Sequence, residues 1–333
     1  MLPAILGLSG LALTDDERAF FRAAAPAGFI LFARNCGDPA QLRALTDSLR
    51  EVSGRGNVPI LIDQEGGRVA RMKPPHWSEF PAAWRFAELY RTAPISGMEA
   101  ARVNAQALAL MLGAAGINVD CLPLLDVRQE GANDVIGDRS LGAEPMQVAA
   151  LGRAVLGGLE AGGAIGVVKH IPGHGRAMAD SHKELPVVNA SADELASDIA
   201  PFHALADAPM AMTAHVLYPA WDAENCASIS PTIIADVIRG EIGFDGLLMS
   251  DDLAMEALKG TPGERARAVI EAGCDVALHC SGEMTDNQAV AEALGGMTQA
   301  ATARLERAMA RAGKGAGDYQ ALATKRDALL ALA

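Results

Sequence analysis

The sequence of 333 residues is half hydrophobic, contains only 4% aromatic residues and carries a formal net charge of −13. The hydrophobic share excludes a disordered chain, and the acidic balance excludes the basic surface that binding to nucleic acid or anionic lipid requires. A chain of this length can bury most of its unfolded surface in one large or two ordinary domains. Because aromatic residues are scarce, the core must be aliphatic.

The five cysteines are widely spaced and form no C-x-x-C pair, so neither a zinc knuckle nor a disulfide framework is predicted. No apolar run reaches the roughly 20 residues of a membrane span. The apolar residues 1–13 lack the basic region and the small-residue cleavage site of a signal peptide. We therefore expect a cytoplasmic protein with reduced cysteines.

Eight short apolar segments recur along the chain, and amphipathic helical patterns lie between them. Their near-continuous apolar character is typical of parallel strands that are covered on both faces. The predicted strands are residues 4–8, 29–32, 59–62, 118–125, 165–169, 210–216, 247–250 and 275–279.

Strands and helices that alternate in this way predict an α/β fold, a (β/α)8 TIM barrel. An open doubly wound sheet is the main alternative, but the first strand–helix junction lacks the G-x-G-x-x-G pattern. No linker interrupts the pattern, so we expect a single domain over residues 1–333, with residues 283–333 as C-terminal packing helices.

Capping residues mark the starts of several helices. Capping boxes predict helices that begin after Thr14 and Ser191. A capping residue followed by proline predicts further helix starts at Asp38 and Ser230. Gly240 lies where a C-terminal glycine is expected to end the last of these helices.

Polar residues follow six of the predicted strands. In a barrel, the carboxyl ends of the strands form one rim, and active sites lie there. The polar ends are Asp63 to Arg71, Asp126 with Asp138 and Arg139, Lys169 to His174 with Asp180 to His182, His215, Asp251 with Asp252, and His279. So many polar ends on one rim predict a functional site rather than helix caps alone.

Two of these segments carry groups suited to nucleophilic or acid–base chemistry. Asp251 and Asp252 precede a helix-like segment, so one is expected to cap it, and Asp251, nearer the strand, to point into the barrel. His174, Asp180 and His182 lie in a segment with hinge-like glycines, and an imidazole titrates near neutral pH.

Two other chemistries remain open at the same rim. Lys169 at a strand end could form a Schiff base, although nearby carboxylates would oppose the lowered pKa that this requires. A metal could be bound by His170, His174, His182 and Asp251, but the H-x-x-x-H spacing is not that of a helical pair. We expect no metal and no cofactor.

Four segments, in order, resemble signature sequences of the glycoside hydrolase family 3 β-N-acetylhexosaminidases of the short bacterial type. They are DQEGGRV from Asp63, DRSLG from Asp138, KHIPGHG with DSH from Lys169 and Asp180, and SDDLAM from Ser250. The resemblance extends to about residue 282. Leu141 and Ile171 stand where phenylalanine is common, and Arg176 where an acidic residue is common.

The resemblance implies a retaining glycosidase with assigned residues. Asp251 matches the nucleophile, His182 the proton donor and acceptor, and Asp180 the residue that orients His182. The positions that bind the terminal sugar are matched by Asp63, Arg71, Arg139, Lys169 and His170. The implied monomeric enzyme releases GlcNAc from the GlcNAc-1,6-anhydroMurNAc-peptides of peptidoglycan recycling.

The residue types agree with that chemistry but leave alternatives. Retaining enzymes usually place two carboxylates about 5–5.5 Å apart, and here a histidine replaces one of them. A histidine would not repel phosphate, so phosphorolysis stays open beside a β-glucosidase, a metal-dependent hydrolase and a sugar-binding barrel. Because the implied substrate is anionic, Arg71, Arg139 and Lys169 would have to make the site locally positive.

Overall fold

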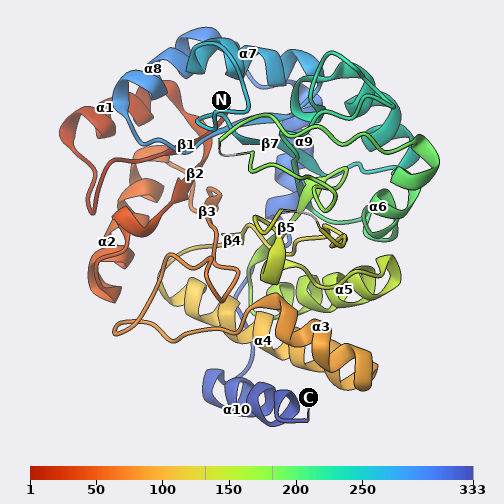
Figure 1. Ribbon diagram of the computed structural model, residues 1–333. Helices are drawn as coiled ribbons and strands as arrows, with labels where there is room; N and C mark the ends of the chain where they lie inside the picture. The colour runs from red at the N-terminus through yellow and green to blue at the C-terminus, as the bar shows by residue number, and fades with distance from the viewer. Residues whose placement is uncertain (132, 182, 333) are drawn as a thin grey trace.

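The computed structural model describes residues 1–131, 133–181 and 183–332. Within these ranges the parallel strands close into a barrel in the order β1 to β8 (Figure 1), which confirms the predicted (β/α)8 fold. The strands are β1 (Leu2–Gly7), β2 (Pro26–Leu31), β3 (Ile60–Ile62), β4 (Val119–Asp120), β5 (Ile165–Ile171), β6 (Met210–Thr213), β7 (Leu247–Asp252) and β8 (Val276–His279).

Helices surround the barrel on its outside (Figure 1). The α-helices are α1 (Asp15–Ala24), α2 (Pro39–Ser53), α3 (Ala83–Thr92), α4 (Pro94–Ala114), α5 (Pro145–Ala161), α6 (Ala192–Ala204), α7 (Pro262–Ala272), α8 (Met284–Ala293), α9 (Gln299–Met309) and α10 (Tyr319–Leu330). A π-helical segment, η4 (Ile233–Glu241), lies between β6 and β7, and single turns form η1 (Ala33–Asn35), η2 (Gly137–Arg139) and η3 (Ala227–Ile229). None of the helices in the described ranges is both long and apolar enough to cross a membrane.

The helix starts predicted at Thr14, Asp38 and Ser191 are confirmed, and Ser230 Oγ accepts from the backbone N–H of Ile233, the first residue of η4, at 3.1 Å. One predicted helix end is wrong. The side chains of Thr14, Asp38 and Ser191 accept hydrogen bonds from the first turns of α1, α2 and α6. Gly240 does not end η4, which continues to Glu241. The backbone N–H of Ile242 bonds to the carbonyl oxygen of Val237, five residues earlier, which is the spacing of a π-helix. The segment therefore ends later than the four-residue spacing of an α-helix predicts.

The core inside the barrel is aliphatic, as the composition predicts. Side chains such as Ile5, Leu61, Val167 and Met249 fill the interior of the closed sheet. A second cluster lies between the strands and the surrounding helices. Helix α9 covers the amino-terminal end of the barrel, because its apolar side chains join the interior cluster, and α10 packs against α4. The carboxyl end of the barrel is left for the polar residues.

Candidate active site

A cavity of about 480 Å³ lies at the carboxyl ends of the strands. Its floor is the upper layer of the barrel core, including Ile30, Met212 and Leu278. Its walls include every predicted site residue that the structure describes: Asp63, Arg71, Arg139, Lys169, His170, Asp180 and Asp251. His182, the predicted proton donor and acceptor, lies outside the described residues. The barrel thus brings together residues from four separate strand ends.

The end of β5 contributes two consecutive residues to the cavity. Neighbouring residues of a regular strand point to opposite faces, but the pairing of β5 with β6 shifts register between Lys169 and Ile171. Lys169 and His170 therefore both line the cavity, and both are buried.

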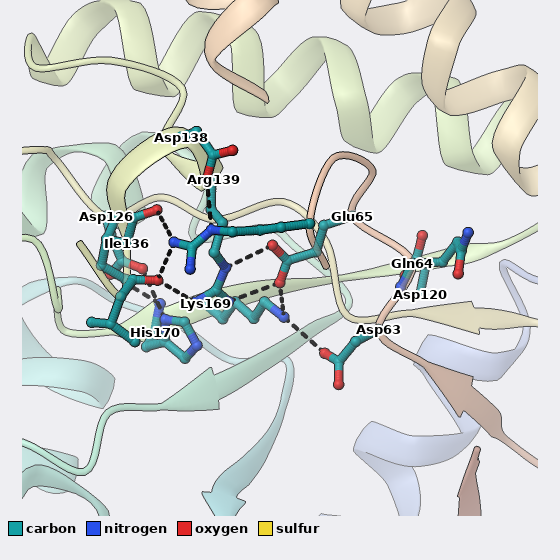
Figure 2. Close-up of polar contacts among 12 residues, drawn as sticks. Asp63, Gln64, Glu65, Asp120, Asp126, Ile136, Asp138, Arg139, Lys169 and His170 are labelled. Carbon is teal, nitrogen blue, oxygen red and sulfur yellow. Dashed lines mark hydrogen bonds and ion pairs between the residues drawn. The ribbon is translucent and has the colours of Figure 1, made fainter. Parts of the chain in front are cut away.

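Buried ion pairs connect the walls of the cavity (Figure 2). Lys169 Nζ lies 2.9 Å from Asp63 Oδ1 and 2.7 Å from Glu65 Oε1. Arg139 donates to both oxygens of Glu65 at 2.8 Å, a bidentate geometry. Arg71 Nη2 lies 3.2 Å from Asp63 Oδ2. Three cations and two carboxylates thus form one continuous network.

This network determines the charge state of its members. Burial alone would raise the pKa of Glu65, but Lys169 and Arg139 together lower it to about 2. Burial opposes the charged form of Lys169, yet Asp63 and Glu65 raise its pKa above the ordinary value. Lys169 is therefore an ammonium ion at neutral pH, which counts against a Schiff base.

Glu65 lies in the predicted polar segment from Asp63 to Arg71, but no role is predicted for it from the sequence. Its side chain is 3% exposed, and its oxygens are occupied by Lys169 and Arg139, whereas the side chain of Asp63 is 16% exposed. Glu65 holds the two cations in place, and Asp63 has room to accept hydrogen bonds from a ligand. Glu65 follows Asp63 by two positions, just after a predicted strand, and this spacing could have identified Glu65 from the sequence.

The turn that carries Arg139 is held from across the cavity. Arg68 donates to Asp138 Oδ1 at 2.7 Å and to the carbonyl oxygens of Val135 and Ile136 at 3.0 and 3.3 Å. The segment after β3 therefore fixes the segment after β4, next to Arg139 (Figure 2).

Asp126, one of the polar strand ends named from the sequence but given no role there, organises the end of β5. Its Oδ2 accepts from His170 Nδ1 at 2.8 Å, and its Oδ1 accepts from the backbone N–H groups of His170 and His174 at 3.2 and 2.7 Å. Burial would raise the pKa of Asp126, but His170 and His174 lower it to about 2. The bond to Nδ1 leaves Nε2 of His170 for a ligand.

Asp251 and Asp252 have different environments at the end of β7. Asp252 Oδ1 accepts from the backbone N–H groups of Ala254 and Cys280 at 2.9 and 3.0 Å, so Asp252 caps the following turn. Asp251 lines the cavity and is 8% exposed. Burial would raise the pKa of Asp251, but the nearby His215 and His170 lower it overall, so Asp251 is ionised at neutral pH.

The segment after β5 forms one side of the cavity, where Asp180 and Ser181 lie. Burial and the nearby His170 lower the pKa of His174 to about 4, so its ring is neutral, and Nε2 lies 3.2 Å from Ser181 Oγ. Arg176, the unusual residue of the signature, pairs with Asp198 of α6. Among the described residues, no three His, Cys, Asp or Glu side chains are placed to hold a metal.

Comparisons with known proteins agree with this geometry. The family model described as "Glycosyl hydrolase family 3 N terminal domain" matches residues 6–313. A β-hexosaminidase of Bordetella avium (strain 197N) is 39% identical over 286 residues, which are 84% of this chain and 80% of that protein.

Solved structures show the same relationship. NagZ from Neisseria gonorrhoeae, in complex with N-trifluoroacetyl-D-glucosamine, superposes with a TM-score of 0.86 at 31% identity, over 99% of this chain and 96% of that one. A glycoside hydrolase family 3 β-N-acetylglucosaminidase from Paenibacillus sp. str. FPU-7 gives a TM-score of 0.82 at 31% identity, over 98% of this chain and 61% of that one. The chain therefore belongs to glycosyl hydrolase family 3, in its NagZ-type β-N-acetylhexosaminidase group.

Proposed function

We propose that this protein is a retaining, exo-acting β-N-acetylglucosaminidase. It is a β-N-acetylhexosaminidase that removes the terminal GlcNAc from GlcNAc-1,6-anhydroMurNAc-peptides during peptidoglycan recycling in the cytoplasm. The observation that carries the proposal is the position of the ionised Asp251 in the same cavity as the network of Asp63, Arg71 and Lys169.

The cavity suits one terminal sugar better than a long polymer. The barrel core closes it from below, so a polysaccharide cannot pass through. A carboxylate paired with cations stays ionised and accepts sugar hydroxyls, while the cations donate to neighbouring hydroxyls. Asp63 with Lys169 and Arg71 provides this combination. N-trifluoroacetyl-D-glucosamine in the NagZ complex supports an N-acylated glucosamine as the ligand.

The proposed reaction has two steps. Asp251 attacks the anomeric carbon and forms a glycosyl–aspartate, while His182 protonates the departing oxygen. In the second step His182 takes a proton from water, which attacks the anomeric carbon and releases Asp251. Asp180 orients His182. The roles of His182 and Asp180 are assigned from their positions in the sequence motif.

The decisive experiment compares turnover of a chromogenic GlcNAc β-glycoside by the wild type and by Asp251→Ala. We expect the variant to lose nearly all activity while keeping the wild-type melting temperature. A slow fluorinated GlcNAc donor should add its glycosyl mass to the peptide that contains Asp251. Equal turnover by the variant would remove Asp251 as the nucleophile.

The same assay separates the alternatives. Loss of turnover with EDTA would indicate a metal-dependent hydrolase, and faster turnover of the corresponding glucoside would indicate a β-glucosidase. Formation of GlcNAc 1-phosphate on addition of phosphate would indicate a phosphorylase. With a purified GlcNAc-1,6-anhydroMurNAc-peptide, mass spectrometry should detect free GlcNAc and the intact anhydroMurNAc-peptide.

A further inference from the structure

The end of β7, which carries Asp251, extends beyond the backbone pairing of β7 with β6. That pairing reaches Met212 and Met249 and then stops. Farther along, side chains of the β6 segment take over the contacts with the main chain of β7. Thr213 Oγ1 accepts from the backbone N–H of Asp251 at 3.3 Å, and His215 Nε2 lies 3.0 Å from the carbonyl oxygen of Asp252.

One further side chain connects these two contacts. Ser228 Oγ lies 2.7 Å from Thr213 Oγ1 and 2.7 Å from His215 Nδ1. Thr213, His215 and Ser228 are all fully buried. Hydrogen bonds between buried groups of this kind are sensitive to the loss of any member.

The donors in this chain of hydrogen bonds can be assigned. A carbonyl oxygen only accepts, so His215 Nε2 carries the hydrogen that it donates to Asp252. Burial lowers the pKa of His215, so the ring is neutral and Nδ1 accepts from Ser228. Ser228 Oγ also lies 3.0 Å from the carbonyl oxygen of Ala214, which only accepts, so the one hydrogen of Ser228 is used by Nδ1 and this carbonyl. Thr213 therefore donates to Ser228 and accepts from the amide of Asp251.

We infer that Thr213, Ser228 and His215 are positioning residues that hold Asp251 in place for its attack on the sugar. Their chain of hydrogen bonds begins at the amide of Asp251 and ends at the carbonyl of Asp252. The backbone is thus held just before and just after the peptide bond that joins Asp251 to Asp252. The N–H of that peptide bond, which belongs to Asp252, donates to Asp251 Oδ1 at 2.8 Å. The inference rests on the proposed role of Asp251.

The test is a pair of substitutions at Thr213. Thr213→Val removes the hydroxyl and keeps the shape, and it leaves the amide of Asp251 without its acceptor. We expect kcat on the chromogenic GlcNAc glycoside to fall roughly 10- to 100-fold, because a small misplacement of a reacting group costs this much, with KM within about twofold. Thr213→Ser restores the hydroxyl and should recover most of the wild-type kcat.

Thr46→Val is the matched control. Thr46 in α2 is also fully buried, and its hydroxyl donates to Ala115 O at 2.8 Å, away from the cavity. We expect a lower melting temperature with the wild-type kcat. If Thr213→Val does not fold, Ser228→Ala interrupts the same chain and should lower kcat in the same way. A folded Thr213→Val, or the folded Ser228→Ala that replaces it, with a kcat equal to that of Thr46→Val would overturn the inference.

A readout that does not depend on activity separates this inference from the proposed function. Nitrogen-15 NMR of the wild type should show His215 as a neutral ring with its hydrogen on Nε2. A hydrogen on Nδ1 would overturn the assigned chain even in an active enzyme. If the wild type does not cleave GlcNAc glycosides, the proposed function fails, and the NMR result still tests whether the chain exists.

Discussion

Glu65 lies two residues after Asp63, but its carboxylate serves a different purpose. It pairs with both Lys169 and Arg139 and supplies these two cations with a buried negative charge. We predict that Glu65→Gln lowers the free energy of unfolding at pH 7 by roughly 3–5 kcal/mol, the usual cost of breaking a buried ion pair. Chemical unfolding measures this value. Glu88→Gln, at an exposed surface pair with Arg85, is the control and should change stability by less than about 1 kcal/mol.

The pH dependence of that difference follows from the lowered pKa of Glu65. A carboxylate with a lower pKa in the folded state stabilises the protein above its ordinary pKa, and this contribution disappears as the pH falls. For Glu65 the window runs from the ordinary value of 4.5 down to about 2. We therefore expect the stability gap between the wild type and Glu65→Gln to narrow as the pH falls through this window. A gap that widens would contradict the assignment.

Asp126 offers a test of the orientation of His170. In Asp126→Asn, the amide oxygen can still accept from the two backbone N–H groups, but the amide nitrogen must donate to His170 Nδ1. The hydrogen of a neutral ring then moves to Nε2, the nitrogen available to the ligand. We predict a fall in kcat/KM of roughly 100- to 1,000-fold in steady-state assays, the usual cost of losing one correctly placed hydrogen-bonding group in an active site.

Asp275→Asn is the matched control for Asp126→Asn. Asp275 is a buried carboxylate that accepts from the backbone N–H of Leu248 at 2.9 Å and pairs with Arg239 at 2.8 Å. It lies at the amino end of β8, away from the cavity. We expect the Asp275→Asn variant to be less stable than the wild type and to keep the wild-type kcat/KM. Equal kinetic effects in the two variants would show that Asp126 matters for stability alone.

At the scale of elements, the strands and their polar ends follow from the sequence, whereas the contacts between the ends do not. Near-continuous apolar segments identify strands, and their order around the barrel places Asp63, Lys169 and Asp251 on one rim. Asp126 bonds to His170 and His174, which lie 44 and 48 positions later in the chain. These hydrogen bonds depend on how the segment after β4 packs against the end of β5 once the barrel closes. No local sequence pattern predicts such a long-range contact.

The segment after β5 lies close to the segment after β4 at Gly175. A Cβ atom on Gly175 would lie far inside contact distance of the carbonyl oxygen of Val127. We predict that Gly175→Ala displaces the segment with His174 and Asp180, and lowers kcat/KM roughly 10- to 100-fold, because the geometry of the acid–base group changes. Gly157→Ala, on the open surface of α5, should leave kcat/KM unchanged and raise stability by about 0.5–1 kcal/mol. Wild-type kcat/KM in Gly175→Ala would contradict this prediction.

For the whole molecule, the cations of the site do not produce a positive cavity. Among its described lining residues, four cations (Arg68, Arg71, Arg139 and Lys169) face six carboxylates (Asp63, Glu65, Asp134, Asp180, Asp251 and Asp252). The expectation of a locally positive site is therefore wrong. The described lining contains phenylalanine but no tryptophan or tyrosine, so we expect sugar recognition to depend on short-range charged hydrogen bonds. These bonds act only after the substrate has entered.

The net charge of the whole molecule predicts how kcat/KM for a charged substrate depends on ionic strength. With a net charge of −13 and no positive excess at the cavity, the protein repels an anionic muropeptide at long range. Raising the ionic strength from about 0.01 M to about 0.1 M shortens the screening length from about 30 Å to about 10 Å and weakens this repulsion. We expect kcat/KM for an anionic muropeptide to stay constant or rise in this range, and that for a neutral chromogenic glycoside to stay constant. A fall with added salt, for the muropeptide alone, would contradict this prediction.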